Sequence, residues 1–541
     1  MKRIKILAIT CLVFMLIIST FGCSKDTKPM QNIDKNDEKD FSISLVSKTL
    51  DKENIFTERD ISAKYDDNIY NIKLADNNSE SDNSKVSINN NNVTITNTGT
   101  YIINGKLTNG SLIVDADDTD KIQLVLNGVE INNSTASAIN IKKAKKVFIT
   151  LADNSENSLS VSGEFEKSED NKADGTIYSK EDLTMNGTGK LTISSQYGHG
   201  LVCNDDLVIT DGNYNITSAK HSIKANDSIS FAGGNLNLTS SKDAVHCDND
   251  SESDKGNIYI QKTSLSINCE DDAIHASGYI IIENGDIKII KSYEGIEGQK
   301  IEINGGNIEI KSSDDGINAS SGNNENISDS NNTDNKSNTL NMRDKNNPFN
   351  SDENCYINIG GGVIIVDADG DGIDSNGYIQ QNNGSITVYG AENSGNGALD
   401  YGISAKINGG TIAAFGYSGM AQGFSSYSSQ GSMLINFEND TSDEFILTDN
   451  NSKKIIAVKP DKKYNSVVFS SKDIEKGSTY IAKAGNQSKT IKMSEISYQD
   501  ENRFERKNNI MNDNMPKNDD FNPHDNKPDK QPDSNQPPRT E

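Results

Sequence analysis

Residues 363–378, with the sequence VIIVDADGDGIDSNGY, carry an acidic spacing that is typical of a calcium-binding loop. From Asp367 onward the pattern D-x-D-x-D-G matches the start of an EF-hand loop, which ends on a bidentate Glu at its twelfth position. Tyr378 occupies that position here, and a four-residue apolar run rather than an amphipathic helix precedes the loop. The stretch is therefore not an EF-hand, and its acidic residues need another explanation.

Residues that could support catalysis are few. Calcium-assisted lyases remove a proton beside a uronate carboxylate, with a Lys or Arg base next to the metal. Lys242 directly precedes Asp243, and Lys220 and Lys224 lie about 20 residues earlier. A Lys beside acidic residues is more often an ion-pair partner than a base. The four histidines between residues 199 and 275 have no nucleophile with them, so catalytic residues stay unassigned.

The chain contains internal repeats of about 22 residues, and the acidic stretch belongs to one of them. The superimposable segments begin at residues 205, 227, 256, 278, 299 and 355. One apolar position marks the register in every unit: Ile223, Val245, Ile274, Ile296, Ile317 and Ile373. These positions are 22, 29, 22, 21 and 56 residues apart, which places extra residues near 248–255 and in the polar insertion 320–353.

Each repeat holds two or three short runs of alternating apolar and polar residues, separated by Asn, Gly or Asp. Alternation with frequent turns predicts strands. A period near 22 with three strands per unit is typical of a parallel β-helix, whose coils stack about 4.8 Å apart. We therefore predict an all-β solenoid over residues 57–424, closed by a short β cap over residues 425–498.

Two positions of the repeat would form columns of side chains along the solenoid. The residue two before the marker is His221, Asp243, Asp272, Glu294, Asp315 and Asp371 in successive units. The residue one after it is Lys224, His246, His275, Glu297, Asn318 and Asp374. Stacking brings such acids to about 5 Å, where two carboxylates repel by roughly 3 kcal/mol at an effective dielectric constant near 20. Protonation, splaying of the side chains into water, or a bound cation would relieve this repulsion.

Carboxylate, Asn and backbone oxygens favour calcium over zinc or copper, although His246 and His275 could admit a transition metal. The predicted calcium ligands are Asp243, Asp271, Asp272, Glu294, Glu297, Asp314, Asp315, Asp369, Asp371 and Asp374. The alternative is plain turn chemistry, because Asp, Asn and Gly are common in tight turns. Recurrence of the acids at fixed repeat positions favours the metal, but individual ligands stay open.

The composition of the chain limits the classes of partner that it can bind. The net charge is −26, which opposes binding to nucleic acid and to anionic lipid but suits divalent cations. We expect no nucleic-acid partner and a monomer. The chain has no Trp to stack on neutral sugars. Proline is absent between Met30 and Asn347, as continuous strand pairing requires.

The N-terminus is predicted to be a bacterial export signal. Basic residues from Lys2 to Lys5 precede a short apolar run, and the sequence TFGC ends at Cys23. We expect a lipoprotein signal peptide over residues 1–22, lipidation of Cys23, and a polar linker over residues 23–56. The predicted location is the extracellular face of the cell membrane, with the lipid as the only membrane contact. Residues 499–541 are expected to be a disordered tail.

The chain resembles a family of bacterial surface carbohydrate-binding proteins built as right-handed parallel β-helices related to pectate lyases. The resemblance rests on TERDISAKYDDNIYNIKL (57–74), on coils such as NGGNIEIKSSDDGINAS, on the insertion between coils, and on KKYNSVVFSSKDIEKGSTY (462–480). It covers about residues 57–495. It implies polysaccharide binding, calcium on the acidic turns, and a lyase-like fold without assured lyase activity.

The function predicted from the sequence is that of a lipid-anchored surface protein that binds calcium and an acidic or plant-type polysaccharide. The first alternative is a calcium-dependent polysaccharide lyase, and the second is a structural surface protein or adhesin. Four aromatic residues near the last coils are candidates for stacking on sugar rings, or for capping the core: Tyr389, Tyr401, Tyr417 and Tyr427.

Overall fold

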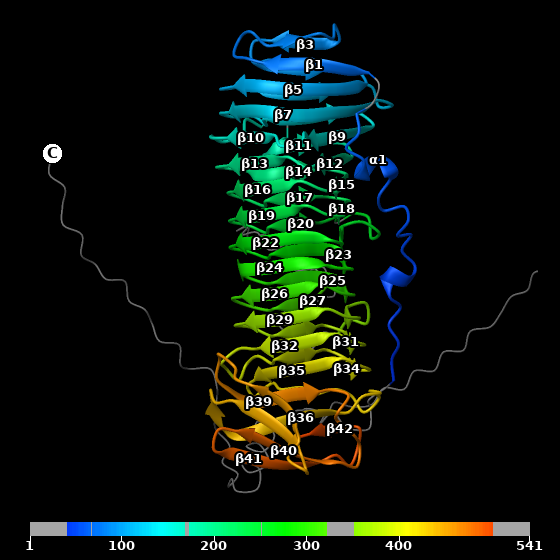
Figure 1. The fold of residues 1–541 in the computed structure, drawn as a ribbon, viewed down its shortest axis with the longest axis vertical. Coiled ribbons are helices and arrows are strands. Elements are labelled where there is room, and N and C mark those ends of the chain that lie inside the picture. The colour runs from blue at the N-terminus through cyan, green and yellow to red at the C-terminus, as the bar shows by residue number, and fades with distance from the viewer. Residues whose placement is uncertain (1–39, 66–67, 168–171, 250, 322–350, 501–541) are drawn as a thin grey trace, which may run out of the picture. The chain divides into compact units, whose positions relative to one another are not determined.

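The computed structural model describes residues 40–65, 68–167, 172–249, 251–321 and 351–500. This part of the chain is nearly all β, with 54% of residues in strands, 2% in helices and about 11 solenoid turns. Short strands follow the chain around each turn and pair in parallel with the turn before and the turn after (Figure 1). The predicted all-β parallel solenoid is confirmed. No helix in the described residues is long and apolar enough to span a membrane.

The coils present three faces, and the longer strands bend around a corner and belong to two of them. We call them the ladder face, the arm face, along which residues 40–56 pack, and the third face. The ladder face, so named for the acidic columns, contains β4 (Asn92–Ile95), β6 (Ser111–Asp115), β8 (Ile139–Lys143), β11 (Gly175–Ser179), β14 (His199–Cys203), β17 (Ile223–Ala225), β20 (Val245–Cys247), the starts of β23 (Ile274–Ile282) and β25 (Ile296–Ile303), β27 (Ile317–Ala319), β30 (Ile373–Ser375) and β33 (Leu399–Tyr401). The arm face contains β1 (Ile69–Leu74), the starts of β5 (Gly99–Leu107) and β7 (Lys121–Asn133), β9 (Lys146–Leu151), β12 (Leu183–Gly187), β15 (Asp206–Ile209), β18 (Ser228–Phe231), β21 (Asn257–Ile260), the ends of β23 and β25, β28 (Tyr356–Ile359), β31 (Tyr378–Gln381) and β34 (Ser404–Ile407). The third face contains the ends of β5 and β7, β10 (Glu156–Val161), β13 (Lys190–Ser195), β16 (Asn213–Ser218), β19 (Asn235–Ser240), β22 (Thr263–Cys269), β24 (Gly285–Ser292), β26 (Asn307–Ser312), β29 (Val363–Ala368), β32 (Ser385–Tyr389) and β35 (Thr411–Gly416).

The predicted register is confirmed at every step of the repeat. The marker residues pair directly from one coil to the next, in the order Ile223, Val245, Ile274, Ile296, Ile317 and Ile373. The pairing register is therefore kept across the 29- and 56-residue spacings. The marker side chains are buried in one continuous apolar core, because each coil covers the apolar face of the next.

Both ends of the solenoid carry antiparallel strands. At the start, β2 (Glu80–Ser81) pairs with β1, and β3 (Val86–Asn89) pairs with β4. At the end, β39 (Tyr464–Ser470) lies antiparallel to β35 and to β36 (Ser432–Thr441), and β42 (Ser497–Gln499) pairs with β36. A separate sheet has the order β38 (Lys454–Val458), β37 (Phe445–Asp449), β40 (Thr479–Ala484) and β41 (Gln487–Lys492). The predicted C-terminal β cap is present, and pairing with β39 covers the last coil's exposed edge.

Residues 40–56 correct the linker prediction, because this part of residues 23–56 packs along the arm face. The 3-10 helix η1 (Val46–Lys48) begins where the backbone N–H of Val46 donates to Glu302 at 2.6 Å. The Glu302 side chain is fully buried and also accepts a hydrogen bond from the Tyr356 hydroxyl at 2.6 Å. Phe41 stacks on Tyr378 with ring centroids 4.5 Å apart. Residues 40–56, which we call the arm, therefore supply further hydrogen-bond donors to a buried carboxylate.

The helix α1 (Glu58–Ile61) holds the next segment against the same face. Thr57 caps it, and the Asp60 side chain accepts a hydrogen bond from the Thr57 backbone N–H. The buried Asp60 carboxylate also accepts from the Thr184 hydroxyl at 2.6 Å and lies 2.8 Å from Lys146 Nζ. Residues 1–39, 322–350 and 501–541, which include the predicted signal peptide and most of the insertion and tail, lie outside the described residues.

Glycines precede the marker residues where coils approach closely at the ladder face. A Cβ on Gly316 would lie 2.2 Å from Val366 Cγ1 and 2.5 Å from the Gly372 carbonyl oxygen. A Cβ on Gly372 would lie 2.2 Å from Val388 Cγ1. These two turns therefore have no room for a side chain, which explains the sequence D-G-I in these units.

Gly316→Val should lower the melting temperature of the protein. The added side chain must displace Val366 or the next turn, and overpacking of this kind costs about 1–3 kcal/mol. Gly395→Ala is the matched control, because its new Cβ would meet only the Asn393 side-chain oxygen, at 3.3 Å. Thermal unfolding followed by circular dichroism measures both. Equal melting temperatures for the two variants would contradict the close packing of these turns.

Candidate metal centre on the ladder face

Two columns of polar side chains run along the ladder face, as the sequence register predicts. We call them the turn column, two residues before each marker, and the strand column, one residue after it. The pairs His246–His275, His275–Glu297, Glu297–Asn318, Asn318–Asp374 and Asp374–Asp400 are neighbours in the strand column. From His246 to Asp374, each strand-column residue lies between two buried residues of its strand, so its side chain points away from the core.

The turn-column acids hold the next coil through one carboxylate oxygen. Oδ1 of Asp315 accepts the backbone N–H of Asp371 at 2.6 Å, and Oδ1 of Asp371 accepts that of Gly397 at 2.5 Å. Oδ1 of Asp243 accepts the N–H of Asp272 at 3.1 Å, and Oδ1 of Asp272 accepts that of Glu294 at 3.1 Å. The acids at these positions therefore do stabilise turns, but these backbone hydrogen bonds use only one oxygen of each carboxylate. At Asp315 and Asp371 the second oxygen stays available to a cation, whereas Asp243 Oδ2 lies 2.6 Å from His246 Nδ1.

Asp315, Asp371 and Asp374 form an all-carboxylate cluster, which we call the acidic triad. One oxygen from each lies within 4.8 Å of those from the other two. Burial, together with the neighbouring carboxylates, raises the pKa of Asp315 to about 6, of Asp371 to about 7 and of Asp374 to about 8. Without a cation the triad therefore retains protons near neutral pH. Hard oxygen donors at this spacing fit a calcium ion in place of those protons.

Asn318 adds an oxygen to the same part of the ladder. It precedes Asp374 by one coil in the strand column. Its Nδ2 donates to Glu294 Oε2 at 3.0 Å, whereas its buried Oδ1 has no hydrogen-bond partner among the described residues. A buried carbonyl oxygen without a donor is unfavourable, and a cation beside it would satisfy it. This unpaired oxygen supports the fit of the triad to a hard cation.

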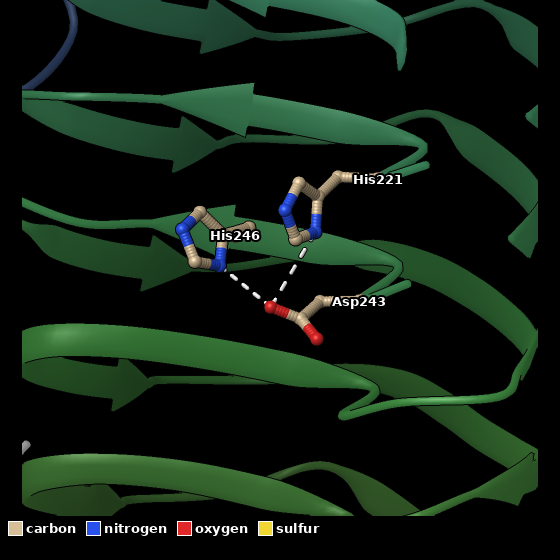
Figure 2. A group of neighbouring side chains, drawn as sticks. All are labelled: His221, Asp243 and His246. Atoms are coloured by element: carbon tan, nitrogen blue, oxygen red, sulfur yellow. Dashed lines mark hydrogen bonds and ion pairs between the residues drawn. The ribbon is translucent and has the colours of Figure 1, made fainter. Parts of the chain in front are cut away.

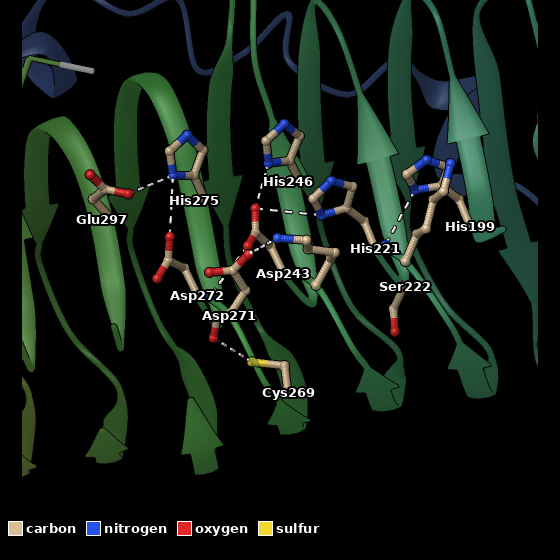
Figure 3. Close-up of polar contacts among 12 residues, drawn as sticks. His199, His221, Ser222, Asp243, His246, Cys269, Asp271, Asp272, His275 and Glu297 are labelled. Atoms are coloured by element: carbon tan, nitrogen blue, oxygen red, sulfur yellow. Dashed lines mark hydrogen bonds and ion pairs between the residues drawn. The ribbon is translucent and has the colours of Figure 1, made fainter. Parts of the chain in front are cut away.

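The neighbouring cluster of Asp272, Glu294 and Glu297 already contains a positive partner. His275 Nδ1 lies 2.7 Å from Glu297 Oε2 and 3.7 Å from Asp272 Oδ2 (Figure 3). Although burial acts to lower it, the bonds to these carboxylates raise the pKa of His275 to about 11. Burial acts to raise the pKa of Glu297, but the His275 hydrogen bond brings it below its usual value. This cluster is less suited to calcium than the acidic triad, because an imidazolium already neutralises part of it.

Upstream, the columns change from acids to histidines. Burial lowers the pKa of His221 to about 2 and that of His199 to about 4. Both rings are therefore neutral at physiological pH. Burial acts to raise the pKa of Asp243, but the hydrogen bond with His246 keeps it below its usual value. The ladder thus presents neutral imidazoles with one carboxylate at this end.

Three predicted ligands do not join any cluster. Lys242 Nζ lies 2.7 Å from Asp271, and Lys462 Nζ lies 2.9 Å from the exposed carboxylate of Asp369. Asp314 hydrogen-bonds to the Tyr293 side chain and raises the pKa of that hydroxyl to about 12. The other seven are in clusters: Asp243, Asp272, Glu294, Glu297, Asp315, Asp371 and Asp374. The Lys242 contact also supports the interpretation of that residue as an ion-pair partner rather than a base.

The sequence analysis missed two groups of acids. Asp400 follows Asp374 in the strand column, and burial raises its pKa. Its signal was present, because GALDYG aligns with GDGIDSNG once the repeat is continued by one unit. Asp182, Asp205 and Asp206 form a further cluster, whose oxygens lie within 4.8 Å of one another. Asp182 and Asp205 precede the regular acidic units, so the repeat pattern gave no signal there.

The four aromatic candidates lie in different surroundings. Tyr389 is partly buried and stacks on Phe415 at 6.1 Å, and the Tyr401 hydroxyl donates to the Gly423 carbonyl at 2.6 Å. Tyr417 is also partly buried, whereas Tyr427 is 47% exposed. Tyr389 packs against the apolar core of the cap. For this residue the capping interpretation has the better support.

Comparisons with known proteins agree with the resemblance seen in the sequence. Residues 89–338 match the model of a family described as carbohydrate-binding domain-containing protein, so this part of the chain is similar to that family. A protein of Acetivibrio thermocellus with the same description is 40% identical over 126 residues. That match covers 23% of this chain and 44% of the relative, so the chain spans less than half of the relative's length.

One solved structure is also similar to this chain. It is described as the polysaccharide lyase-like protein from C. thermocellum, in a gadolinium derivative. The likeness has 31% sequence identity and a TM-score of 0.39, and it covers 44% of this chain and 92% of the other.

The raised pKa values predict how the stability of the calcium-free protein depends on pH. An acid whose pKa is raised by folding binds more protons in the folded state, so the free energy of unfolding falls as pH rises toward the folded pKa. Between about pH 7 and pH 9 the stability should fall as Asp374 and then Glu294, whose pKa burial raises to about 9, lose their protons. The raised pKa of His275 adds a loss in the same direction.

Asp374→Asn should flatten this fall in chelator, whereas Asp314→Asn should leave the slope unchanged. Calcium should remove most of the fall, and at 100-fold excess over its dissociation constant it should add about 2.7 kcal/mol per independent site. Urea unfolding at a series of pH values measures the effect. A stability that rises from pH 7 to pH 9 in chelator, or that ignores calcium, would contradict this picture of the triad.

Proposed function

We propose that the chain binds an acidic polysaccharide through calcium held by the acidic triad. The observation that carries the proposal is the convergence of Asp315, Asp371 and Asp374, all partly or fully shielded from water, on one point of the ladder. Asn318 would supply a further oxygen. Calcium takes six to eight oxygen ligands, so three carboxylates and an amide leave positions for a ligand's own oxygens.

Charge explains why a cation would be needed. With a net charge of −26, the protein repels a polyuronate at long range. Salt screens that repulsion beyond about 8 Å at physiological ionic strength. At shorter range a bound calcium supplies the positive charge that this face lacks, and it contacts protein and sugar carboxylates together. Its role here is to bridge the two anionic surfaces.

The family match supports a carbohydrate as the partner. The matched residues 89–338 include most of the solenoid and one member of the triad, Asp315. The other two members follow in the next coil, after the insertion. A solenoid face offers a regular row of side chains with the coil spacing, which suits an extended polymer better than a small molecule.

Polygalacturonate beads should retain the protein in calcium and release it in chelator. Asp371→Asn combined with Asp374→Asn should weaken retention at least about tenfold, equal to about 1.4 kcal/mol. Asp314→Asn is the control, because it removes one carboxylate charge from the residue next to Asp315 and leaves the three carboxylates of the triad in place. Retention that survives chelation would exclude the calcium bridge and favour a neutral glycan bound elsewhere, with the exposed Tyr427 as the first residue to test.

We also propose that the protein is exported and anchored by a lipid on Cys23. The sequence supports this through the basic start, the short apolar run and the Gly-Cys pair at 22–23. A lipid on Cys23 would place the arm and the solenoid at the cell surface, where polysaccharide is available.

Cys23→Ala should move the protein from the membrane fraction of the producing bacterium into the medium or into the fraction that is soluble without detergent. Metabolic labelling with a fatty acid provides the second readout. Lys48→Ala, a change in the exposed arm, serves as the control for expression. Equal membrane association and no label in the unsubstituted chain would contradict lipidation.

A further inference from the structure

A row of stacked histidines lies at the upstream end of the ladder face. The rings of His199, His221, His246 and His275 follow one another with centroid distances of 5.0, 4.2 and 5.0 Å (Figure 3). The coil spacing of about 4.8 Å produces this stacking. These are all the histidines in the described residues, so their gathering on one face is a feature of the fold rather than of a His-rich composition.

Asp243 lies where two of these rings converge. Its Oδ2 is 2.6 Å from His246 Nδ1 and 3.5 Å from His221 Nδ1 (Figure 2). Its other oxygen is occupied by the backbone N–H of Asp272. Asp243 is 5% exposed, so Oδ2 faces the two imidazoles rather than solvent. One carboxylate oxygen and two ring nitrogens therefore point at a common position.

His221 Nδ1 is the second observation that points to a ligand. It is buried and has no hydrogen-bond partner among the described residues, since 3.5 Å to Asp243 is too long for a good hydrogen bond. The unsatisfied nitrogen faces Asp243 Oδ2 on one side, and its ring lies between the His199 and His246 rings. Burying such an atom without a partner is costly unless something binds it.

We propose that His221 Nδ1, His246 Nδ1 and Asp243 Oδ2 bind a first-row transition-metal ion, with zinc as the best fit. The three atoms lie within 4.8 Å of one another. A tetrahedral zinc with ligands at 2.0–2.1 Å places those ligands about 3.4 Å apart. The His221–Asp243 distance of 3.5 Å already matches, and the His246–Asp243 distance of 2.6 Å needs to open by less than about 1 Å.

The donor types separate this site from the acidic triad. Imidazole nitrogens favour zinc and its neighbours, whereas the all-oxygen triad favours calcium. The His275–Glu297 pair lies between the two along the ladder and is neutralised internally. One ladder would thus hold two kinds of cation at different coils. This inference does not depend on polysaccharide binding or on calcium.

Neighbouring groups hold the ligands in place. His199 Nδ1 accepts the backbone N–H of His221 at 3.2 Å, and its Nε2 lies 3.8 Å from Asp174. The Asp272 N–H holds Asp243 Oδ1, so that Oδ2 is the oxygen turned toward the two imidazoles. Such outer contacts orient metal ligands and reduce the cost of binding. Three protein ligands leave a fourth position for water, because His221 and His246 are each partly exposed.

Calorimetric titration of zinc chloride into the mature chain, with calcium in excess to occupy the acidic triad, tests the proposal. We expect one zinc per chain that depends on the three ligands. His221→Gln and His246→Gln should each weaken zinc binding at least about 100-fold, more than the loss of an outer contact would. Asp371→Asn with Asp374→Asn, and separately His275→Gln, should leave zinc affinity within about threefold.

Zinc affinity that ignores His221→Gln and His246→Gln would overturn the site. Loss of binding in His275→Gln alone would also overturn it, because the ion would then lie among Asp243, Asp272 and His275. Circular dichroism of each variant guards against misfolding. Anomalous diffraction at the zinc edge from the unsubstituted protein gives an answer free of mutation: a peak bonded to the three ligand atoms supports the site, and its absence from that position overturns it.

Discussion

In-register parallel stacking is the constraint on which the rest of this structure depends. Each side chain on a coil has a counterpart about 4.8 Å away on the next coil. For apolar residues this repetition is favourable and builds the continuous core of Ile, Val and Leu. For carboxylates it is costly, since two unscreened charges about 5 Å apart repel by roughly 3 kcal/mol at an effective dielectric constant near 20. The ladder face has to offset that repulsion at every acidic coil.

The groups that offset the repulsion between carboxylates differ along the solenoid. At Asp243 and at Glu297, histidine neighbours share the charge. Backbone N–H groups of the following coil donate to Asp315 and Asp371, which couples each acid to the fold. At the acidic triad these donors are insufficient, and the pKa values of its members rise into the neutral range. Cation binding on this face is therefore the expected response to a repulsion that the solenoid itself creates.

The sequence was sufficient to predict the fold and its register, because one buried apolar residue per coil marks the repeat even across a 56-residue gap. The two columns followed from that register. The register could not predict which of two adjacent acids joins a cluster. Asp314 turns toward Tyr293, whereas Asp315 joins the triad. That difference depends on the turn geometry, which the repeat period does not encode.

Contacts between distant segments were also beyond the sequence. Residues 40–56 look like a linker by composition, and nothing in them signals that Glu302, far along the chain, needs their backbone N–H groups. The convergence of His221 and His246 on Asp243 depends on side-chain rotamers and on a stagger between the columns. The register placed these histidines on one face, but only the coordinates show the nitrogen left unpaired.

A crystal structure of the protein with calcium and an acidic oligosaccharide would test the central claim most directly. We expect a calcium ion 2.3–2.6 Å from oxygens of Asp315, Asp371 and Asp374, with a sugar carboxylate completing its coordination. Calcium absent from the triad, or an oligosaccharide bound away from the ladder face, would contradict it.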